Sequence, residues 1–320
     1  MALSKLAALP FTQSDGRLGL SEAAYGDVAA DLGAVIHCAW AVNFNMALSS
    51  FESDCLAGVS HLLRLCRAPR AAGRPAAIFA FCSSVSAVAR VPAGQAAPEH
   101  VPDLAWAQGI GYAQSKNVAE HVCARAGAGA GAVPVRVLRV GQIVGDTVHG
   151  VWNATEAIPL MMQTAHTVGC LPRLPEDLAW LPVDTVARAV VEISFAGAAA
   201  AGQEEEEEAV VANVVNARTF HWTRDLLPAL RRAGLQFDEV APREWIRRLR
   251  ASEPDPQKNP PIKLVDFLAS KYDRDEADFS PSRRYETETA ARLSPALAGA
   301  SVLDQDLVNK FIKYFSETAW

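Results

Sequence analysis

The first two thirds of the chain alternate short apolar runs with amphipathic stretches. Residues 76–82 form a continuous apolar run of strand length, and further strands are predicted at 33–39, 133–140 and 210–215, which are mainly apolar. Between them, apolar residues recur at helical spacing over 56–66, 112–125 and 185–194, the last preceded by Asp184 as a predicted N-cap. This alternation predicts an α/β fold in which helices cover both faces of a parallel sheet.

After residue 218 the alternation of strands and helices gives way to mainly amphipathic helices. Amphipathic helices are predicted at 224–234, 242–250 and 303–315, with a proline-rich link at 253–261. We therefore expect a Rossmann-like, doubly wound core over residues 1–218 and a smaller, mainly helical substrate lobe over 219–320. Because such sheets bind ligands beyond the carboxyl ends of their strands, we expect a cleft between the two parts, to which residues 146–180 contribute.

Two segments of low complexity suggest no site. The five glutamates at 204–208 are interpreted as a solvated surface loop. The Gly-Ala repeat at 127–132 could be mistaken for a phosphate-binding loop. A dinucleotide loop follows a strand and opens a helix, whereas this repeat follows a predicted helix and enters a strand, so we interpret it as an ordinary connection.

Composition excludes several classes of protein. The 320 residues are 50% hydrophobic and 21% charged, which is typical of a folded globular enzyme. A net charge of −6 gives no attraction to nucleic acid or to an anionic membrane. The six cysteines are scattered, so neither a metal site nor a disulfide framework is indicated and a reducing compartment fits best. With no apolar run of membrane-spanning length and no secretory signal, we expect a cytoplasmic protein.

A Y-x-x-x-K pattern, Tyr112 to Lys116, lies inside a predicted helix, so both side chains project from one helix face. A lysine ammonium beside a phenol lowers the phenol pKa from about 10 toward neutrality and makes it a general acid or base. Ser84 ends a buried strand upstream, where its hydroxyl would meet Tyr112 and a substrate carbonyl. Ser83 and Ser86 are rival hydroxyls, and strand alternation favours Ser84.

Ser, Tyr and Lys in this order and setting resemble the short-chain dehydrogenase/reductase superfamily. Further motifs resemble one branch of it, the thioester reductase domains of male-sterility type that terminate fungal carboxylic acid reductases and nonribosomal peptide synthetase-like enzymes. The resemblance runs from about residue 15 to the C-terminus. The motifs lie at 35–45, 51–52, 81–84, 111–116, 139–146 and 180–184, and at Trp245 with 259–264.

The resemblance implies roles for individual residues. Ser84 would polarise the substrate carbonyl and Tyr112 would protonate the developing oxyanion, while Lys116 tunes Tyr112 and holds the nicotinamide ribose of NADP(H). Two further groups are implied: Ala39, Trp40, Val140 and Ile143 beside the cofactor, and Trp152, Asn153 and the stretch to Met162 along the substrate channel.

The sequence departs from this family at its start. Members begin with a strand and a G-x-x-G-x-x-G turn, whereas here about 34 residues precede the strand at Val35, and Gly16 to Gly19 has a single G-x-x-G step with no apolar strand before it. We therefore expect an N-terminally incomplete sheet and weak or absent NADP(H) binding. The bare sheet edge must be covered, either by residues 1–20 or by a second copy of the chain, and we favour the homodimer.

Three hypotheses for function follow. The first is an NADPH-dependent oxidoreductase that reduces a small-molecule or carrier-bound acyl thioester to an aldehyde in fungal-type secondary metabolism. The second is a cofactor-independent isomerase, cyclase or lyase that reuses Ser84, Tyr112 and Lys116 as acid-base groups. The third is an inactive remnant or binding module. We favour the first because the catalytic trio and the substrate lobe are intact.

Overall fold

The computed structural model describes residues 5–196 and 209–320, so the glutamate run at 204–208 lies outside the described residues. The chain forms two compact units built from interleaved segments. The first unit comprises 1–141, 188–215 and 284–298, and the second comprises 142–187, 216–283 and 299–320. This division differs from a single boundary at residue 218, because the chain leaves the first unit after its third strand and returns to it twice.

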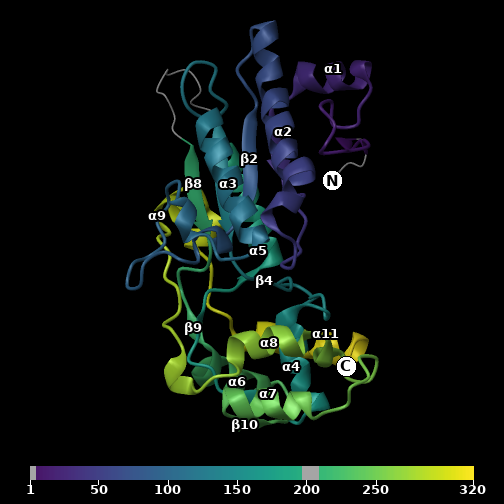
Figure 1. Cartoon of the computed structure of the whole chain (residues 1–320), viewed down its shortest axis with the longest axis vertical. Helices are drawn as coiled ribbons and strands as arrows, with labels where there is room; N and C mark the ends of the chain where they lie inside the picture. Colours follow the sequence, from purple (N-terminus) through teal and green to yellow (C-terminus); the bar gives the residue numbers. More distant parts are fainter. Residues whose placement is uncertain (1–4, 197–208) are drawn as a thin grey trace. The chain divides into compact units, whose positions relative to one another are not determined.

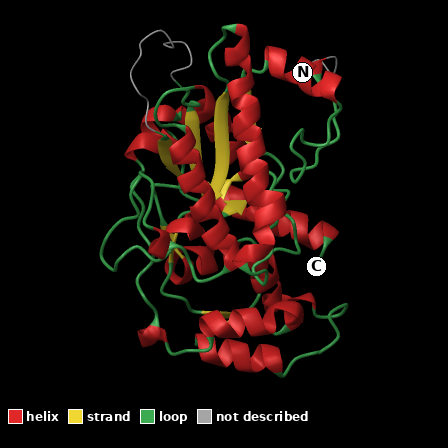
Figure 2. Cartoon of the chain, turned by 45° about the horizontal axis from the view of Figure 1, so that its top comes forward, coloured by secondary structure: helices red, strands yellow, loops and turns green. Residues whose placement is uncertain are grey.

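The first unit is built on a parallel sheet (Figures 1 and 2). Its strands are β1 (Ala34–His37), β2 (Ile78–Ser84), β3 (Val135–Val140) and β8 (Val210–Val214), in the order β1-β2-β3-β8, and every neighbouring pair is parallel. The strands are apolar runs because helices and loops bury both faces of the sheet. Phe79, Ala80 and Phe81 of β2 are fully buried. The predicted α/β fold with a Rossmann-like parallel sheet is confirmed.

The helices of the first unit follow the predicted apolar spacing. Helix α2 (Ala57–Arg67) buries Val59, Leu62, Leu63 and Cys66 in the core beside the sheet. The other elements are α1 (Glu22–Asp31), α3 (Gly111–Ala126), α9 (Glu288–Leu293), α10 (Pro295–Ala298) and the short turns η2 (Leu48–Phe51), η3 (Glu52–Leu56), η4 (Ala68–Ala72), η5 (Val85–Val88) and η6 (Leu104–Trp106).

Helix α5 (Val183–Phe195) contains residues of both units and begins one residue before Asp184. The prediction that Asp184 is its N-cap is therefore wrong. Its carboxylate instead accepts hydrogen bonds from the Thr147 backbone N–H at 3.2 Å and from the Thr147 hydroxyl at 2.5 Å. The acidic side chain still lies in the first helical turn, where it complements the helix dipole.

The second unit is mainly helical, with three short strand pairs that the sequence patterns did not predict. A core rich in tryptophan, including Trp152, Trp180, Trp222 and Trp245, holds it together. Its strands pair as β4 (Ile143–Val144) with β7 (Leu181–Pro182), β5 (Cys170–Pro172) with β10 (Asp238–Val240), and β6 (Asp177–Leu178) with β9 (Phe220–His221). Its helices are α4 (Ala157–Thr167), α6 (Leu227–Arg232), α7 (Pro242–Arg250), α8 (Val265–Tyr272) and α11 (Gln305–Thr318), with η8 (Trp222–Leu226), η9 (Pro260–Leu264) and η10 (Glu276–Asp278).

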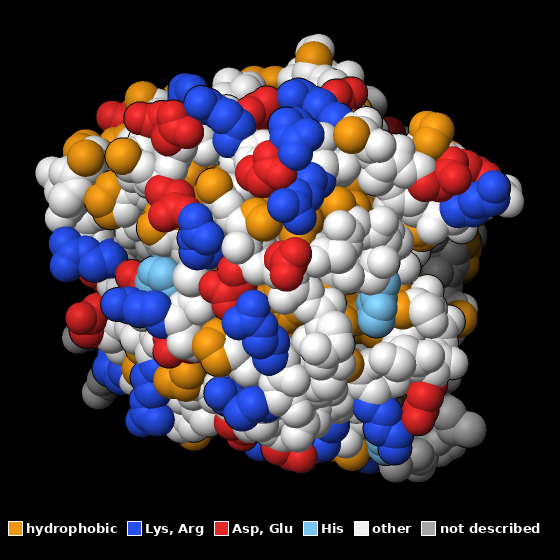
Figure 3. Space-filling model, turned by 90° about the horizontal axis from the view of Figure 1, so that it is seen from below, with side chains coloured by type: hydrophobic (Ala, Val, Ile, Leu, Met, Phe, Trp, Pro, Cys, Tyr) orange, Lys and Arg blue, Asp and Glu red, His pale blue; other side chains and the backbone are white. Residues whose placement is uncertain are grey.

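Charges on the second unit are largely paired. Helix α7 buries Trp245 and Leu249, while its arginines form ion pairs such as Arg247 with Glu244 and Arg250 with Asp273. Figure 3 shows the same mixture of cationic and anionic side chains over the face that it presents. Within residues 5–196 and 209–320, no helix has the length and apolar character that crossing a bilayer requires.

The segment before β1 packs on helix α2. His61 Nδ1 of α2 donates to the Gln13 carbonyl at 2.9 Å, and Leu18 is buried in the same core cluster as α2. Among the described residues no strand pairs with the outer edge of β1, where Ile36 is 37% exposed. Residues 12–19 therefore cover α2 and not the strand edge. The homodimer over that edge stays a prediction.

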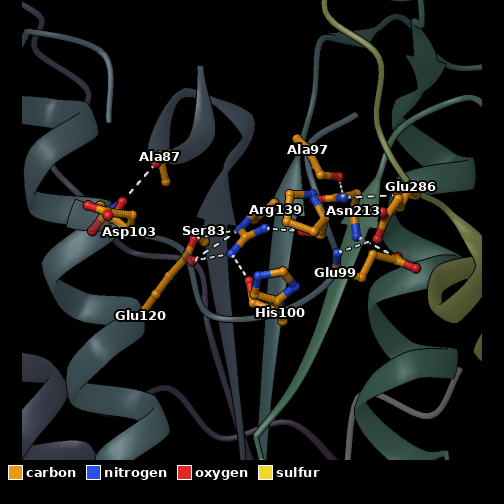
Figure 4. Close-up of polar contacts among 12 residues, drawn as sticks. Ser83, Ala87, Ala97, Glu99, His100, Asp103, Glu120, Arg139, Asn213 and Glu286 are labelled. Atoms are coloured by element: carbon orange, nitrogen blue, oxygen red, sulfur yellow. Dashed lines mark hydrogen bonds and ion pairs between the residues drawn. The ribbon is translucent and has the colours of Figure 1, made fainter. Parts of the chain in front are cut away.

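One ion pair is fully buried beside the sheet (Figure 4). The guanidinium of Arg139 on β3 donates to both carboxylate oxygens of Glu120 on α3, at 2.7–3.1 Å. It also donates to the carbonyls of Pro98 and His100, both at 2.7 Å, and Ser83 of β2 donates to the same carboxylate. Two strands, one helix and one loop thus converge on a single charge pair.

A second polar cluster joins strand β8 to the same loop (Figure 4). The Asn213 side-chain amide donates to the carbonyls of Ala97 and Glu286, at 3.0 and 2.9 Å. The carboxylate of Glu99 accepts from the backbone N–H groups of Asn213 and Ala290. The loop at 97–100 is therefore anchored on β3 and on β8, although it contains no regular element.

We expect Arg139→Met to lower the free energy of unfolding by about 3–5 kcal/mol, because it leaves the Glu120 carboxylate buried without its partner. The double variant Arg139→Met/Glu120→Met is expected to recover part of this loss, because no unpaired charge remains. Urea unfolding measures both. As a control, Arg247→Met breaks an exposed pair and is expected to cost less than about 1 kcal/mol. A single Arg139 variant as stable as this control contradicts the interpretation.

Candidate active site

The structure brings Ser84 and Tyr112 together. Ser84 is the last residue of β2 and Tyr112 is the second residue of α3. The Ser84 Oγ accepts hydrogen bonds from the Ser86 backbone N–H at 3.2 Å and from the Ser86 hydroxyl at 3.0 Å. The Ser84 proton is thereby free for another acceptor, and the Ser84 hydroxyl is hydrogen-bonded to the Tyr112 phenol.

The two rival hydroxyls are engaged elsewhere. Ser83 is buried and its hydroxyl donates to Glu120, so it belongs to the buried ion pair. Ser86 uses its proton on Ser84. Successive residues of a strand point to opposite faces. Ser83 therefore faces the ion pair, while the next residue, Ser84, faces Tyr112.

A close backbone crossing positions the start of α3. A Cβ on Gly111 would lie 2.2 Å from the Met46 carbonyl oxygen, so only glycine fits where residues 46–48 pass the first turn. This crossing brings Phe44 edge-on to Tyr112, with ring centroids 5.2 Å apart. The Asn117 amide then ties α3 to the carbonyls of Ala87 and Asp103. The helical turn that carries Tyr112 is therefore fixed by backbone contacts before and after it.

Lys116 lies in an aromatic enclosure. Its side chain is buried, and its ammonium donates to the Cys82 carbonyl at 2.6 Å. The same nitrogen is 4.1 Å from the ring centroid of Trp40 and 4.7 Å from that of Phe81. The Trp40 indole N–H donates to the Ser115 hydroxyl at 3.2 Å, which fixes the ring over α3. Cation–π attraction compensates part of the cost of burying this charge.

The pKa values of the pair differ from the sequence-based expectation. Burial raises the pKa of Tyr112, and the hydrogen bond from Ser84 only partly opposes this rise. Burial also lowers the pKa of Lys116 to about 8. The prediction that Lys116 lowers the tyrosine pKa is wrong here, because burial is the largest cause of the shift and the Lys116 ammonium lies 6.0 Å from the centroid of the Tyr112 ring, farther than from that of Trp40. Tyr112 is therefore a protonated group at neutral pH, which suits a proton donor.

The residues predicted to contact the cofactor occupy different settings. Ala39 is exposed after β1, and Trp40 covers Lys116. Val140 is half-buried at the end of β3 in the first unit, whereas Ile143 begins β4 in the second. Trp40 lies over Lys116, and Val140 is the register partner of Ser84 on the neighbouring strand. The cofactor roles of all four residues stay predictions.

The residues predicted to line the substrate channel all lie in the second unit. Trp152 and Met162 are buried in its hydrophobic core, and the Trp152 indole N–H donates to Glu156 at 3.1 Å. Asn153 is exposed, and its side-chain oxygen accepts from the backbone N–H and hydroxyl of Thr155. In this structure each of them has a local structural role, and their contact with substrate stays a prediction.

Comparison with known proteins identifies the family. The model of the family described as "Male sterility protein" matches residues 2–190. This chain belongs to the male sterility protein family. Adenylate-forming reductase stbB of Stachybotrys bisbyi is 31% identical over 98% of this chain, which spans 29% of that protein. The chain spans between 24% and 30% of the first three curated relatives that it matches.

Solved structures confirm the fold expected for a male sterility family member. The terminal R domain of the myxalamid biosynthetic pathway has a TM-score of 0.77 at 21% identity, over 97% of this chain and 75% of that one. A thiolation-reductase di-domain from an archaeal nonribosomal peptide synthetase has a TM-score of 0.67 at 18% identity, over 95% of this chain and 61% of that one. These structures show the fold, and together with the family match and the adenylate-forming reductase relatives they confirm the resemblance to thioester reductase domains.

The family implies a dinucleotide cofactor, and the residues present fit its nicotinamide ribose. Tyr112 and Lys116 would hold the nicotinamide ribose, since an ammonium has three N–H donors and the Cys82 carbonyl uses one. No residue described before β1 forms a glycine-rich strand-to-helix turn. Helix α1 has Glu22 in its first turn, and the Ser21 hydroxyl accepts from the Ala24 backbone N–H. An acidic, capped helix start does not suit a pyrophosphate.

Sequence reasoning missed three side chains that touch this male sterility family site. Phe44 packs on Tyr112, and His37 lies beside Trp40 and Phe81 with its Nε2 buried and without a hydrogen bond. Burial, followed by the charge of Lys116, lowers the pKa of His37 to about 4. Cys38 places its sulfur 3.3 Å from that of Cys82. His37 and Cys38 lie at or just beyond the carboxyl end of β1, and this position is the signal that could have found them, whereas Phe44 lies in the loop seven residues after β1.

The buried Lys116 predicts a pH-dependent stability. An unfolded lysine has a pKa of about 10.4, so between pH 8 and that value the unfolded chain holds a proton that the folded chain has lost. Raising the pH across this window therefore stabilises the fold. Relative to Lys116→Met, we expect the wild-type free energy of unfolding to increase by about 2 kcal/mol from pH 7 to pH 10. Urea unfolding of both proteins at each pH measures this.

Lys313→Met, which removes an exposed lysine of α11, controls for the loss of a lysine side chain as such. A difference between wild type and Lys116→Met that stays constant from pH 7 to pH 10 would show that Lys116 is not buried as described.

Proposed function

We propose that this chain is a thioester reductase domain that reduces a carrier-bound acyl thioester to an aldehyde with NADPH. The observation that supports this most directly is the hydroxyl pair of Ser84 and Tyr112 at the carboxyl end of β2, beside the buried Lys116. A carrier-bound substrate is supported by the archaeal structure, in which a thiolation domain adjoins the reductase.

The geometry gives each residue of the pair a distinct task. The Ser84 hydroxyl, which donates to Tyr112 in this structure, turns to the thioester carbonyl oxygen when substrate binds and orients it. When bound, NADPH supplies a hydride to the carbonyl carbon. Tyr112, kept protonated by its raised pKa, donates its proton to the oxygen as negative charge develops there. Breaking of the C–S bond then releases the aldehyde and the carrier thiol.

Lys116 acts on the ribose side of this arrangement. Its ammonium retains two N–H donors beyond the one used by the Cys82 carbonyl. Trp40 shields the amine from water, so that a hydrogen bond from Lys116 to a ribose hydroxyl would form in a partly dry environment. With a pKa near 8, the amine is mostly charged at neutral pH.

We expect Tyr112→Phe to lower turnover by about 10²- to 10⁴-fold, because it removes only the proton donor. Turnover is followed by NADPH absorbance with aromatic and aliphatic acyl-N-acetylcysteamine thioesters, at the same NADPH concentration for every variant. Tyr272→Phe is the matched control, since this phenol is likewise hydrogen-bonded, accepting from Lys271 at 2.7 Å, but lies in the core of the second unit. Equal activity of Tyr112→Phe and wild type contradicts the proposed role.

We expect NADPH to bind this chain with a Kd of about 1 mM or weaker, that is, about −4 kcal/mol or less favourable. The reason is that residues 5–33, the part before β1 that the structure describes, present no backbone cradle to the pyrophosphate. Calorimetric titration measures the Kd. A micromolar Kd would show that other residues hold the phosphates. Turnover of a substrate without any NADPH would favour the cofactor-independent hypothesis instead.

A further inference from the structure

Two thiols meet at the carboxyl ends of neighbouring strands. The parallel register of β1 and β2 pairs His37 with Phe81, so the next step along both strands sets Cys38 opposite Cys82. Their sulfur atoms are 3.3 Å apart. Adjacent strands lie about 4.8 Å apart, within the range of Cα separations that a disulfide bridges. All six cysteines of the chain are free thiols in this structure.

We propose that Cys38 and Cys82 form a peroxide-sensitive dithiol that closes to an intramolecular disulfide. A bond of about 2.05 Å requires the sulfurs to approach by about 1.3 Å from their separation of 3.3 Å. Cys38 can supply this movement, because it lies one residue beyond the end of β1 and its residue is exposed. Cys82 lies within β2 and stays in place, with its carbonyl bonded to Lys116.

The surroundings distinguish this pair from the other thiols. Cys55, Cys66, Cys123 and Cys170 are buried, so Cys38 is the exposed cysteine of the chain. The hydrogen bond from the Cys82 thiol lowers the pKa of Cys38 to about 6, against the effect of its partial burial, and the charge of Lys116 acts in the same direction. The pKa of Cys82 is raised, because Cys82 is the donor to Cys38 and is itself more deeply placed. One sulfur is thus a ready nucleophile and the other its resolving partner.

The reaction with hydrogen peroxide balances in two steps. The Cys38 thiolate attacks one peroxide oxygen, so that an S–O bond forms, the O–O bond breaks and hydroxide leaves as water after taking a proton. The Cys82 sulfur then attacks the sulfenic sulfur of Cys38, so that the S–S bond forms and the second oxygen leaves as water. Two thiols are oxidised and one peroxide is reduced, and an added dithiol reverses the change.

The test treats the whole chain with hydrogen peroxide, blocks the remaining thiols with N-ethylmaleimide in denaturant, and maps the peptides without reduction. We expect the loss of two of the six alkylatable thiols and, after digestion with trypsin and Glu-C, a cross-link between peptides 23–52 and 71–90. Neither peptide contains a second cysteine, so the linkage is unambiguous. Dithiothreitol is expected to restore all six thiols.

Three variants sharpen the result. Cys38→Ser and Cys82→Ser are each expected to lose the cross-link completely, and in Cys82→Ser the Cys38 sulfenic acid is expected to be trapped by dimedone. Cys55→Ala is the matched control, because this buried thiol also acts on the charge of Lys116, and it is expected to keep the cross-link. Circular dichroism checks that each variant folds.

Three outcomes would overturn the proposal: disulfides between chains, a linkage through any other cysteine, or sulfinic and sulfonic acid at Cys38 without a bond to Cys82. The readout is covalent and does not depend on substrate turnover. It therefore stands or fails independently of the proposed reductase activity.

Discussion

The buried pair of Arg139 and Glu120 is the constraint on which the rest of the first unit depends. A charge pair without solvent is tolerated only when every donor and acceptor is satisfied, and here the guanidinium also binds the carbonyls of Pro98 and His100. These contacts fix β3, α3 and the loop at 97–100 relative to one another. A shift of α3 along the sheet would break several charged hydrogen bonds at once.

That constraint determines where the reactive hydroxyls lie. Ser83 donates to Glu120, and this hydrogen bond fixes which side chains at the carboxyl end of β2 point toward the ion pair. The next residue, Ser84, must then point elsewhere, and it meets Tyr112 at the start of the same helix that carries Glu120. Two successive residues of β2 thus contact two residues of α3: Ser83 bonds Glu120 of the ion pair, and Ser84 bonds Tyr112 of the candidate catalytic pair. The backbone of β2 and α3 that holds the buried ion pair therefore also positions the candidate catalytic hydroxyls.

The sequence predicted the sheet well because buried parallel strands are mainly apolar, and it predicted that Ser84 and Tyr112 lie together because one ends a strand and the other begins a helix. It failed where a contact depends on three-dimensional neighbours. Nothing in the Y-x-x-x-K spacing shows that the Lys116 amine bonds the Cys82 carbonyl beneath Trp40, and so the tyrosine pKa was predicted in the wrong direction. The three strand pairs of the second unit are too short to leave a period in the sequence.

Lys116 connects the features at the carboxyl edge of the sheet. Burial removes water from the Lys116 ammonium, which is unfavourable. The Cys82 carbonyl, the rings of Trp40 and Phe81, and the sulfur groups of Cys82 and Cys38 offset part of this cost. The same positive charge favours a thiolate at Cys38 and disfavours a proton on His37. The buried amine therefore contributes to the charge states of both groups, while the hydrogen bond with Cys82 is the larger cause at Cys38 and burial is the larger cause at His37. Oxidation of Cys38 and Cys82, or a ribose bound to Lys116, would therefore change the hydrogen bonds and solvation of this nitrogen.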